Sequence, residues 1–181
     1  VRLTRLAGEP VDDEVDVNST GTVTTVFVVD DDDGVRTSLG ILLDSAGYRA
    51  VPFSSAADFL AQYDPVRPGC LVLDMRMPGM TGMELIQELA RRGSFLPVIF
   101  ITGHGDVPMA VEAMKAGAFD FLQKPFSPRD LLERIERALA ADTEARQVLS
   151  RTEELRQRYA TLTPREKEVM ALIVAGHANK V

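Results

Sequence analysis

Short apolar runs alternate with amphipathic stretches of helical length between residues 23 and 140. Unbroken runs of β-branched or apolar residues are typical of strands that are buried on both faces of a sheet. Such runs predict strands at Thr25–Val29, Arg49–Phe53, Cys70–Asp74, Val98–Ile101 and Phe119–Leu122. The amphipathic stretches predict helices at Val35–Ala46, Ala56–Gln62, Gly82–Arg92, Val107–Ala116 and Pro128–Leu139. Five strands that alternate with five helices indicate an α/β domain, in which helices cover both faces of a parallel sheet.

The segments that flank this region have different patterns. Residues 1–22 contain several acids, Gly and Pro without a helical or strand period, which predicts a mobile leader to which we assign no role. Residues 141–161 contain neither Gly nor Pro, so we expect the last helix to continue out of the domain as a helical linker. A heptad-like spacing joins Val148, Thr152, Leu155, Tyr159 and Leu162. This spacing leaves two alternatives, a solvated linker and a dimerising coiled coil.

The last twenty residues begin with a helix-start signal. Thr163, Pro164 and Glu166 form a capping box with proline at the first helical position. Apolar side chains then recur at Val169, Met170, Leu172 and Ile173. Gly176 suits the end of this helix, and a second element begins at Asn179 where the sequence stops.

Composition narrows the class of protein. The 181 residues are 45% hydrophobic and 26% charged, which is typical of a soluble globular protein. The net charge of −7 argues against a broad electrostatic surface for nucleic acid or for an anionic membrane. Every unbroken apolar run is far shorter than the roughly 20 residues of a spanning helix. The start of the chain also lacks the apolar region of a secretory signal. A lone cysteine, Cys70, and two histidines do not readily form a zinc site, so we expect an inert thiol and a cytoplasmic location.

Acidic residues follow two of the predicted strands. The first strand ends in four consecutive acids, Asp30 to Asp33, and the third ends at Asp74. In a parallel sheet both strand ends reach the same carboxyl edge, where ligands bind. Carboxylates that converge repel one another, and oxygen ligands without His or Cys favour a hard ion such as Mg²⁺. The alternative is a solvated acidic turn that caps the next helix, and we expect Asp32 and Asp33 to be caps or supporting residues.

The fourth and fifth predicted strands add a hydroxyl and an amine to this edge. Thr102 opens a Gly-rich loop that also contains His104, and Lys124 precedes Pro125 after the fifth strand. A metal ion and Lys neutralise phosphoryl oxygens, Thr donates a hydrogen bond, and one carboxylate can attack phosphorus. The ordered set therefore predicts a site that handles a phosphoryl group. We expect His104 to border this site rather than to act as a general base or metal ligand.

Four segments of the chain resemble the receiver domain of two-component response regulators. They are Val28–Asp32, Leu71–Gly82, Ile101–His104 and Gln123–Phe126, and they occur in the family's order and spacing. The amino-acid sequence from Thr102 to Val111 is similar to that of the FixJ-type subgroup. The stretch from Leu162 to Lys180 resembles the start of a LuxR-type helix-turn-helix domain.

The resemblance implies a fold and a domain division. The fold is flavodoxin-like, a doubly wound five-stranded parallel sheet in the order 2-1-3-4-5, here with a C-terminal helical linker. The receiver would occupy residues 23–140, the linker residues 141–161, and the truncated start of the DNA-binding domain residues 162–181. A helix-turn-helix reads bases with its second helix, so we expect binding of promoter DNA only through a complete C-terminal domain.

The resemblance also implies a role for each residue at the carboxyl edge. Asp74 is the expected phosphoacceptor. Asp30, Asp31 and Asp74 are the expected side-chain ligands of Mg²⁺, and the backbone carbonyl of Arg76 is the expected main-chain ligand.

The switch residues follow from the same resemblance. Thr102 matches the hydroxyl that follows the phosphoryl group, Lys124 matches the ammonium that pairs with it, and Phe121 matches the switch aromatic. Phe121 lacks the hydroxyl of the commoner Tyr, so packing alone would hold its inward state.

The expected function is a switch rather than an enzyme. A sensor histidine kinase would pass a phosphoryl group to Asp74, which would favour a homodimer and control transcription through DNA binding. One rival is a phosphatase that attacks with an Asp after its first strand; such enzymes require Asp-x-Asp followed by Thr or Val, which Asp32-Asp33-Gly34 does not match. Another is a stand-alone receiver that regulates a protein partner without DNA.

Overall fold

A single parallel sheet forms the centre of the molecule. The computed structural model describes residues 24–103 and 107–174. The strands are β1 (Thr25–Val29), β2 (Arg49–Phe53), β3 (Gly69–Asp74), β4 (Val98–Thr102) and β5 (Asp120–Gln123). Their order in the sheet is β2-β1-β3-β4-β5, and every pair is parallel. The predicted fold class and strand order are therefore confirmed.

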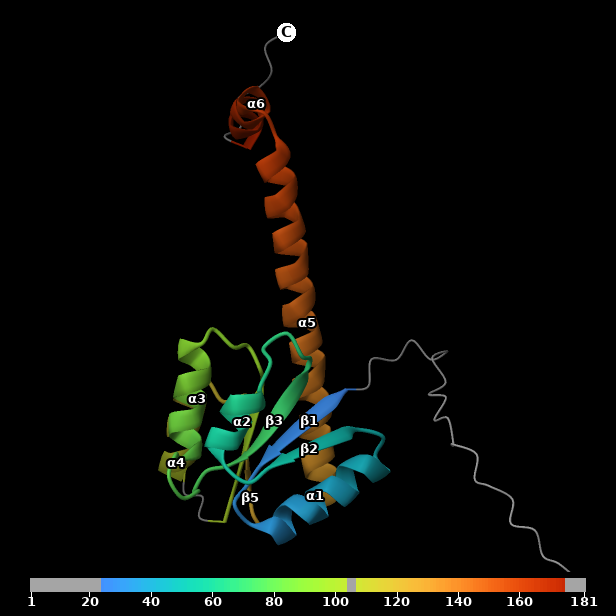
Figure 1. Cartoon of the computed structure of the whole chain (residues 1–181), viewed down its shortest axis with the longest axis vertical. Helices are drawn as coiled ribbons and strands as arrows, with labels where there is room; N and C mark the ends of the chain where they lie inside the picture. Colours follow the sequence, from blue (N-terminus) through green and yellow to red (C-terminus); the bar gives the residue numbers. More distant parts are fainter. Residues whose placement is uncertain (1–23, 104–106, 175–181) are drawn as a thin grey trace, which may run out of the picture.

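Helices cover both faces of the sheet, as predicted (Figure 1). They are α1 (Asp33–Ser45), α2 (Ala56–Gln62), α3 (Gly82–Arg91), α4 (Val107–Lys115), α5 (Pro128–Thr161) and α6 (Pro164–Val174). Apolar residues of α1 and α5 pack against one face, and those of α2, α3 and α4 pack against the other. Helix α1 begins two residues earlier than predicted because Asp32 is its N-cap and accepts hydrogen bonds from the N–H groups of Gly34 and Val35.

Alternation along the strands divides the core into two layers. Phe27 and Leu71 face the layer under α2 and α3, whereas Val28 and Val72 face the layer under α1 and α5. The first layer contains an aromatic cluster, whose members are Phe27, Phe53, Phe59 and Tyr63. Cys70 is fully buried in the second layer, and this burial raises the pKa of its thiol. An inert thiol is therefore expected.

Helix α5 continues without interruption from the domain into the predicted linker. The helix has 34 residues; its first part packs against the sheet and the rest projects well beyond it (Figure 1). Helix α6 follows at the far end. On the projecting part Val148, Leu155 and Tyr159 are exposed. The predicted capping box of α6 is confirmed, because the Glu166 carboxylate accepts hydrogen bonds from the N–H and the hydroxyl of Thr163. Among the described residues no helix combines the length and the apolar character needed to cross a membrane.

Candidate functional site at the carboxyl edge of the sheet

Two buried carboxylates lie side by side at the carboxyl edge. Val29 of β1 is opposite Leu73 of β3, so the residues that follow them, Asp30 and Asp74, are at the same level of neighbouring strands. Asp30 is 2% exposed and Asp74 is 8% exposed. Two carboxylates taken out of water at one place need a nearby cation, because like charges in a buried site destabilise each other.

Lys124 supplies that cation from the loop between β5 and α5. Its Nζ lies 2.9 Å from Asp30 Oδ2 and 3.1 Å from Asp74 Oδ1. The loop is fixed by the backbone, since Lys124 N–H donates to the carbonyl of Thr102 at 2.7 Å, and the Lys124-Pro125 peptide is cis. One ammonium therefore bridges two carboxylates from strands that are far apart in the sequence. With both carboxylates ionised this group of three side chains keeps a net charge of −1.

The pKa of the Asp74 carboxyl is above its ordinary value. Burial is the largest cause, the hydrogen bond from Arg76 N–H and the contacts with Lys124 act in the opposite direction, and the charge of Asp30 adds to the increase. Burial alone would lower the pKa of Lys124, but its hydrogen bonds and charge interactions with Asp30 and Asp74 together raise it. Lys124 is therefore held in its charged form, whereas Asp74 is a carboxylate of increased basicity.

The four consecutive acids after β1 have different roles. The Oδ1 atom of Asp30 accepts from Asp32 N–H at 2.9 Å, and Asp32 in turn caps α1. The predicted capping role is thus confirmed for Asp32. Asp31 and Asp33 are exposed. In the described part of the chain no three His, Cys, Asp or Glu side chains lie close enough together to hold a metal ion. Asp30 and Asp74 thus lie close together as predicted, both in contact with Lys124, whereas Asp31 is exposed to solvent.

The loop after Asp74 is built around a glycine. The Arg76 N–H donates to Asp74 Oδ2 at 2.7 Å, and the Gly82 N–H donates to the carbonyl of Met75 at 3.1 Å. A Cβ atom at Gly82 would lie 2.5 Å from the Asp74 carbonyl oxygen and 2.8 Å from the Phe100 ring. Only glycine permits this close approach, which places the first turn of α3 directly behind Asp74.

The remaining predicted residues surround these carboxylates at different depths. Thr102 ends β4 and is 1% exposed. Phe121 is half-buried on β5 and packs against the core layer that contains α3 and α4. His104 lies outside the described residues. The methionines Met75 and Met77 are buried in the core, as expected for packing residues.

Three contributors to this edge were not predicted from the sequence. They are Gly82, the Arg76 N–H as a hydrogen-bond donor to Asp74, and Arg36 of α1, which donates to the Asp30 carbonyl at 2.6 Å. The spacing of Gly82 within the motif after Asp74 was a usable signal. For Arg36 the signal was a single basic residue close behind a run of four acids.

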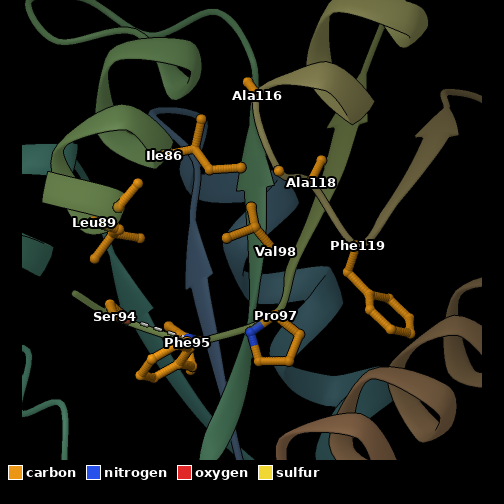
Figure 2. A pocket seen from close by; sticks show the side chains of 12 residues that line it. Ile86, Leu89, Ser94, Phe95, Pro97, Val98, Ala116, Ala118 and Phe119 are labelled. Carbon is orange, nitrogen blue, oxygen red and sulfur yellow. Dashed lines mark hydrogen bonds between the residues drawn. The ribbon is translucent and has the colours of Figure 1, made fainter. Parts of the chain in front are cut away.

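A pocket of about 490 Å³ lies elsewhere, where β4 begins (Figure 2). Its lining is mainly apolar and contains no charged side chain. Figure 2 labels Ile86, Leu89, Ser94, Phe95, Pro97, Val98, Ala116, Ala118 and Phe119. Since phosphoryl chemistry requires charged and hydrogen-bonding groups, the pocket does not compete with the carboxyl edge as the reactive site.

The sequence profile described as the response regulator receiver domain matches residues 26–136, which is more than half of the chain. The chain belongs to the response regulator receiver family. Over 155 residues this response regulator is 46% identical to the transcriptional regulatory protein FixJ of Azorhizobium caulinodans, and the match covers 86% of this chain and 74% of that protein.

Solved structures agree with the family assignment. The response regulator StyR has a TM-score of 0.79 and 49% identity, over 87% of this chain and 79% of that one. The crystal structure of FixJ-N has a TM-score of 0.61 and 51% identity, over 65% of this chain and 94% of that one. The predicted resemblance to the receiver family, and to its FixJ-type members, is confirmed.

Proposed function

We propose that this response regulator is a phosphorylation switch in which Asp74 accepts a phosphoryl group from a sensor histidine kinase. The observation that carries the proposal is the bridge from Lys124 to Asp30 and Asp74 at the edge of the sheet. A lysine that already binds a carboxylate oxygen of Asp74 can also neutralise an oxygen of a phosphoryl group on that residue.

Asp74 has the properties of a nucleophile in such a transfer. A carboxylate oxygen of Asp74 attacks the phosphorus of a phosphohistidine on the kinase. The P–O bond forms while the P–N bond breaks, and the imidazole leaves with the bonding pair and takes up a proton. The increased basicity of Asp74 favours attack, and the Arg76 N–H holds the other carboxylate oxygen in place.

A divalent cation fits the chemistry of the available donors. The side chains of Asp30, Asp31 and Asp74 and the carbonyl of Arg76 offer only oxygen atoms, which is the set that Mg²⁺ prefers. The net charge of −1 on the bridged group favours a cation on the solvent side. When bound, Mg²⁺ neutralises charge on the phosphoryl oxygens. The carboxylate of Asp31 is exposed, so it would hold the ion on the side that faces solvent.

Phosphorylation then biases the conformation of the face formed by α4, β5 and α5. The hydroxyl of Thr102 donates to the phosphoryl group, and Phe121 moves into the space beside it. The altered face favours a homodimer. The relative FixJ is named a transcriptional regulatory protein, which supports transcription control as the output. Binding of promoter DNA would then require a complete LuxR-type domain, of which residues 162–181 would be the start, with residues 141–161 as the linker after the receiver.

The test is labelling with a small-molecule phosphodonor such as acetyl phosphate in the presence of Mg²⁺, followed by intact mass measurement. We expect the wild type to gain a single phosphoryl group and Asp74→Asn to gain none. The control is Asp44→Asn, which removes an exposed carboxylate near the other end of α1 and should be labelled like the wild type. Full labelling of Asp74→Asn would exclude this residue as the acceptor.

A second assay separates the switch from the phosphatase alternative. A switch retains the phosphoryl group on Asp74, so a generic phosphate ester should not be hydrolysed over many turnovers. Sustained release of phosphate from the ester, lost in Asp74→Asn, would instead support an enzyme. Sedimentation of the labelled and unlabelled protein tests the expected dimer.

A further inference from the structure

Arg36 connects the first turns of α1 to the backbone of the acidic loop. Its side chain is only 15% exposed although it lies among four acids. One guanidinium nitrogen donates to the carbonyl of Asp30 at 2.6 Å, and the other donates to Asp33 Oδ1 at 2.9 Å. A guanidinium holds two acceptors in a fixed geometry, so Arg36 fixes the relative position of the loop and the helix.

The bonded carbonyl belongs to the peptide group that joins Asp30 to Asp31. Peptide groups are planar, so a hydrogen bond that fixes the oxygen also fixes the direction in which the chain reaches the Cα atom of Asp31. The other parts of Asp30 are already held: its N–H donates to the carbonyl of Phe53 at 3.3 Å, and its carboxylate binds Asp32 N–H and Lys124. Among the contacts of the described residues, the Arg36 bond is the one that acts on the 30–31 peptide itself.

Asp31 depends on a fixed backbone for its position, because its side chain is exposed and is not packed in the core. It is exposed between a buried acid and a helix cap, and the carboxylates of Asp30, Asp32 and Asp33 surround it in the sequence. Repulsion among these charges favours a more open loop. Arg36 opposes that tendency with a charge of the opposite sign and with two directional bonds.

We infer that Arg36 is a positioning residue for the divalent cation: by holding the peptide between Asp30 and Asp31, it presents Asp31 to the ion. The inference rests on the proposed function, in which Asp31 is a ligand. Arg36 does not touch the ion in this scheme. Partners that orient metal ligands in this way typically contribute about 10- to 100-fold to metal affinity.

An electrostatic role and a positioning role of Arg36 predict opposite changes in cation affinity when its side chain is removed. If Arg36 acted only as a nearby positive charge, its removal would strengthen binding of a cation, because a repulsive interaction is lost. If Arg36 positions Asp31, its removal weakens binding. The sign of the change in affinity therefore distinguishes the two roles.

The experiment measures the affinity of the 181-residue chain for Mn²⁺, and for Mg²⁺ by competition, through the electron paramagnetic resonance signal of free Mn²⁺. We expect Arg36→Ala to bind Mn²⁺ about tenfold more weakly than the wild type. Arg36→Lys keeps the charge but reaches only one acceptor, so it should lose part of the affinity. Arg36→Gln, which is neutral but retains an N–H donor, should bind better than Arg36→Ala.

The matched control is Arg165→Ala on α6. Arg165 also pairs with an acid three residues away, Glu168, but it is exposed and far from the sheet in the sequence. This variant should bind Mn²⁺ like the wild type. Unchanged or tighter binding by Arg36→Ala, with its fold intact by circular dichroism, would overturn the inference. If Arg36→Ala does not fold, equal binding by the wild type, Arg36→Lys and Arg36→Gln would overturn it.

Comparison with Asp31→Asn separates this inference from the proposed function. If Asp31→Asn loses affinity and Arg36→Ala does not, only the positioning role fails. If the wild type binds no Mn²⁺, both the metal site and the inference fail. Labelling by the phosphodonor separately tests whether Asp74 is the phosphoacceptor.

Discussion

The carboxylate of Asp142 on α5 accepts a hydrogen bond from the N–H of Gly69, the first residue of β3, at 3.0 Å. The same Oδ2 atom pairs with Arg146 at 2.8 Å, and Arg146 donates to the carbonyls of Val66 and Arg67. The first turns of the predicted linker are therefore attached to the end of β3 opposite Asp74. This attachment determines where α5 leaves the sheet.

We predict that Asp142→Ala destabilises the protein strongly. Asp142 is 2% exposed, and its removal leaves the Gly69 N–H and the Arg146 guanidinium without their shared acceptor. Loss of one partner from a buried pair costs about 3 to 5 kcal/mol. Urea unfolding measures the change. The control is Glu153→Ala, whose exposed contact with Arg156 spans 4.0 Å, and it should cost less than about 1 kcal/mol. Equal effects of the two variants would contradict the prediction.

A second prediction concerns Gly82. In Gly82→Ala the new Cβ would meet the Asp74 carbonyl oxygen at 2.5 Å, so the first turn of α3 or the loop after Asp74 must move. We expect a loss of about 1 to 3 kcal/mol in the free energy of unfolding and slower labelling by the phosphodonor.

Gly40 on α1 provides the matched control for Gly82. No atom lies within 4 Å of a Cβ built there, so Gly40→Ala should be neutral, or stabilising by up to about 1 kcal/mol, and should not change labelling. Wild-type behaviour of Gly82→Ala would show that the close approach behind Asp74 is not required.

The raised pKa of Asp74 predicts the direction of two pH effects. A protonated carboxyl is a poor nucleophile, so labelling should slow as the pH falls through the raised pKa. For stability, the folded protein binds this proton more tightly than the unfolded chain does. The contribution of Asp74 to stability is therefore most favourable at low pH and decreases as pH rises from 3.8 through the folded value.

Asp74→Asn removes the titrating group and tests this second effect. We expect the variant to be more stable than the wild type at neutral pH, because Asn carries no charge into the buried site. The difference should shrink as the pH is lowered. Urea unfolding across a pH series gives the measurement, and a difference that grows towards low pH would show that the pKa of Asp74 is lowered instead of raised.

The sequence pattern was sufficient for the fold and for part of the site. Strand runs and their order along the chain located Asp30, Asp74 and Lys124 at one edge, because parallel strands bring their carboxyl ends together. The period of apolar residues depends on local geometry, and so do helix caps such as Asp32. These features are therefore visible in a single sequence.

Most of the contacts that were not predicted join residues far apart in the sequence, and the local period of apolar residues gives no information about such pairs. Asp142 meets Gly69 across 73 residues of sequence, and Arg146 reaches carbonyls about 80 residues away. Such pairs form only after the helix has packed on the sheet. For Arg36 the sequence showed a basic residue close behind four acids, but not its use of the Asp30 carbonyl, since a backbone acceptor carries no sequence signature.

Lys124 and Arg36 are both cations beside the acids, yet we predict opposite effects on metal affinity. Lys124 contacts Asp30 Oδ2 and Asp74 Oδ1 and so competes for two carboxylates that would hold the ion, whereas Arg36 binds a backbone carbonyl. Lys124→Met should therefore bind Mn²⁺ more tightly than the wild type, by several-fold or more, because a competing charge is removed. The control is Lys115→Met, on the exposed end of α4, with unchanged binding.

Without metal, Lys124→Met should be less stable than the wild type, because Asp30 and Asp74 are left buried without their cation. Removing one partner of a buried charge pair costs about 3 to 5 kcal/mol, and the pKa of Asp74 should rise further in response. A cation that binds only the folded state stabilises it by RT ln(1 + [L]/Kd). The tighter site of the variant gains more from added Mg²⁺, so the stability gap should narrow as Mg²⁺ is raised. A gap that stays constant in urea unfolding at increasing Mg²⁺ would show that Lys124 and the ion do not share the two carboxylates.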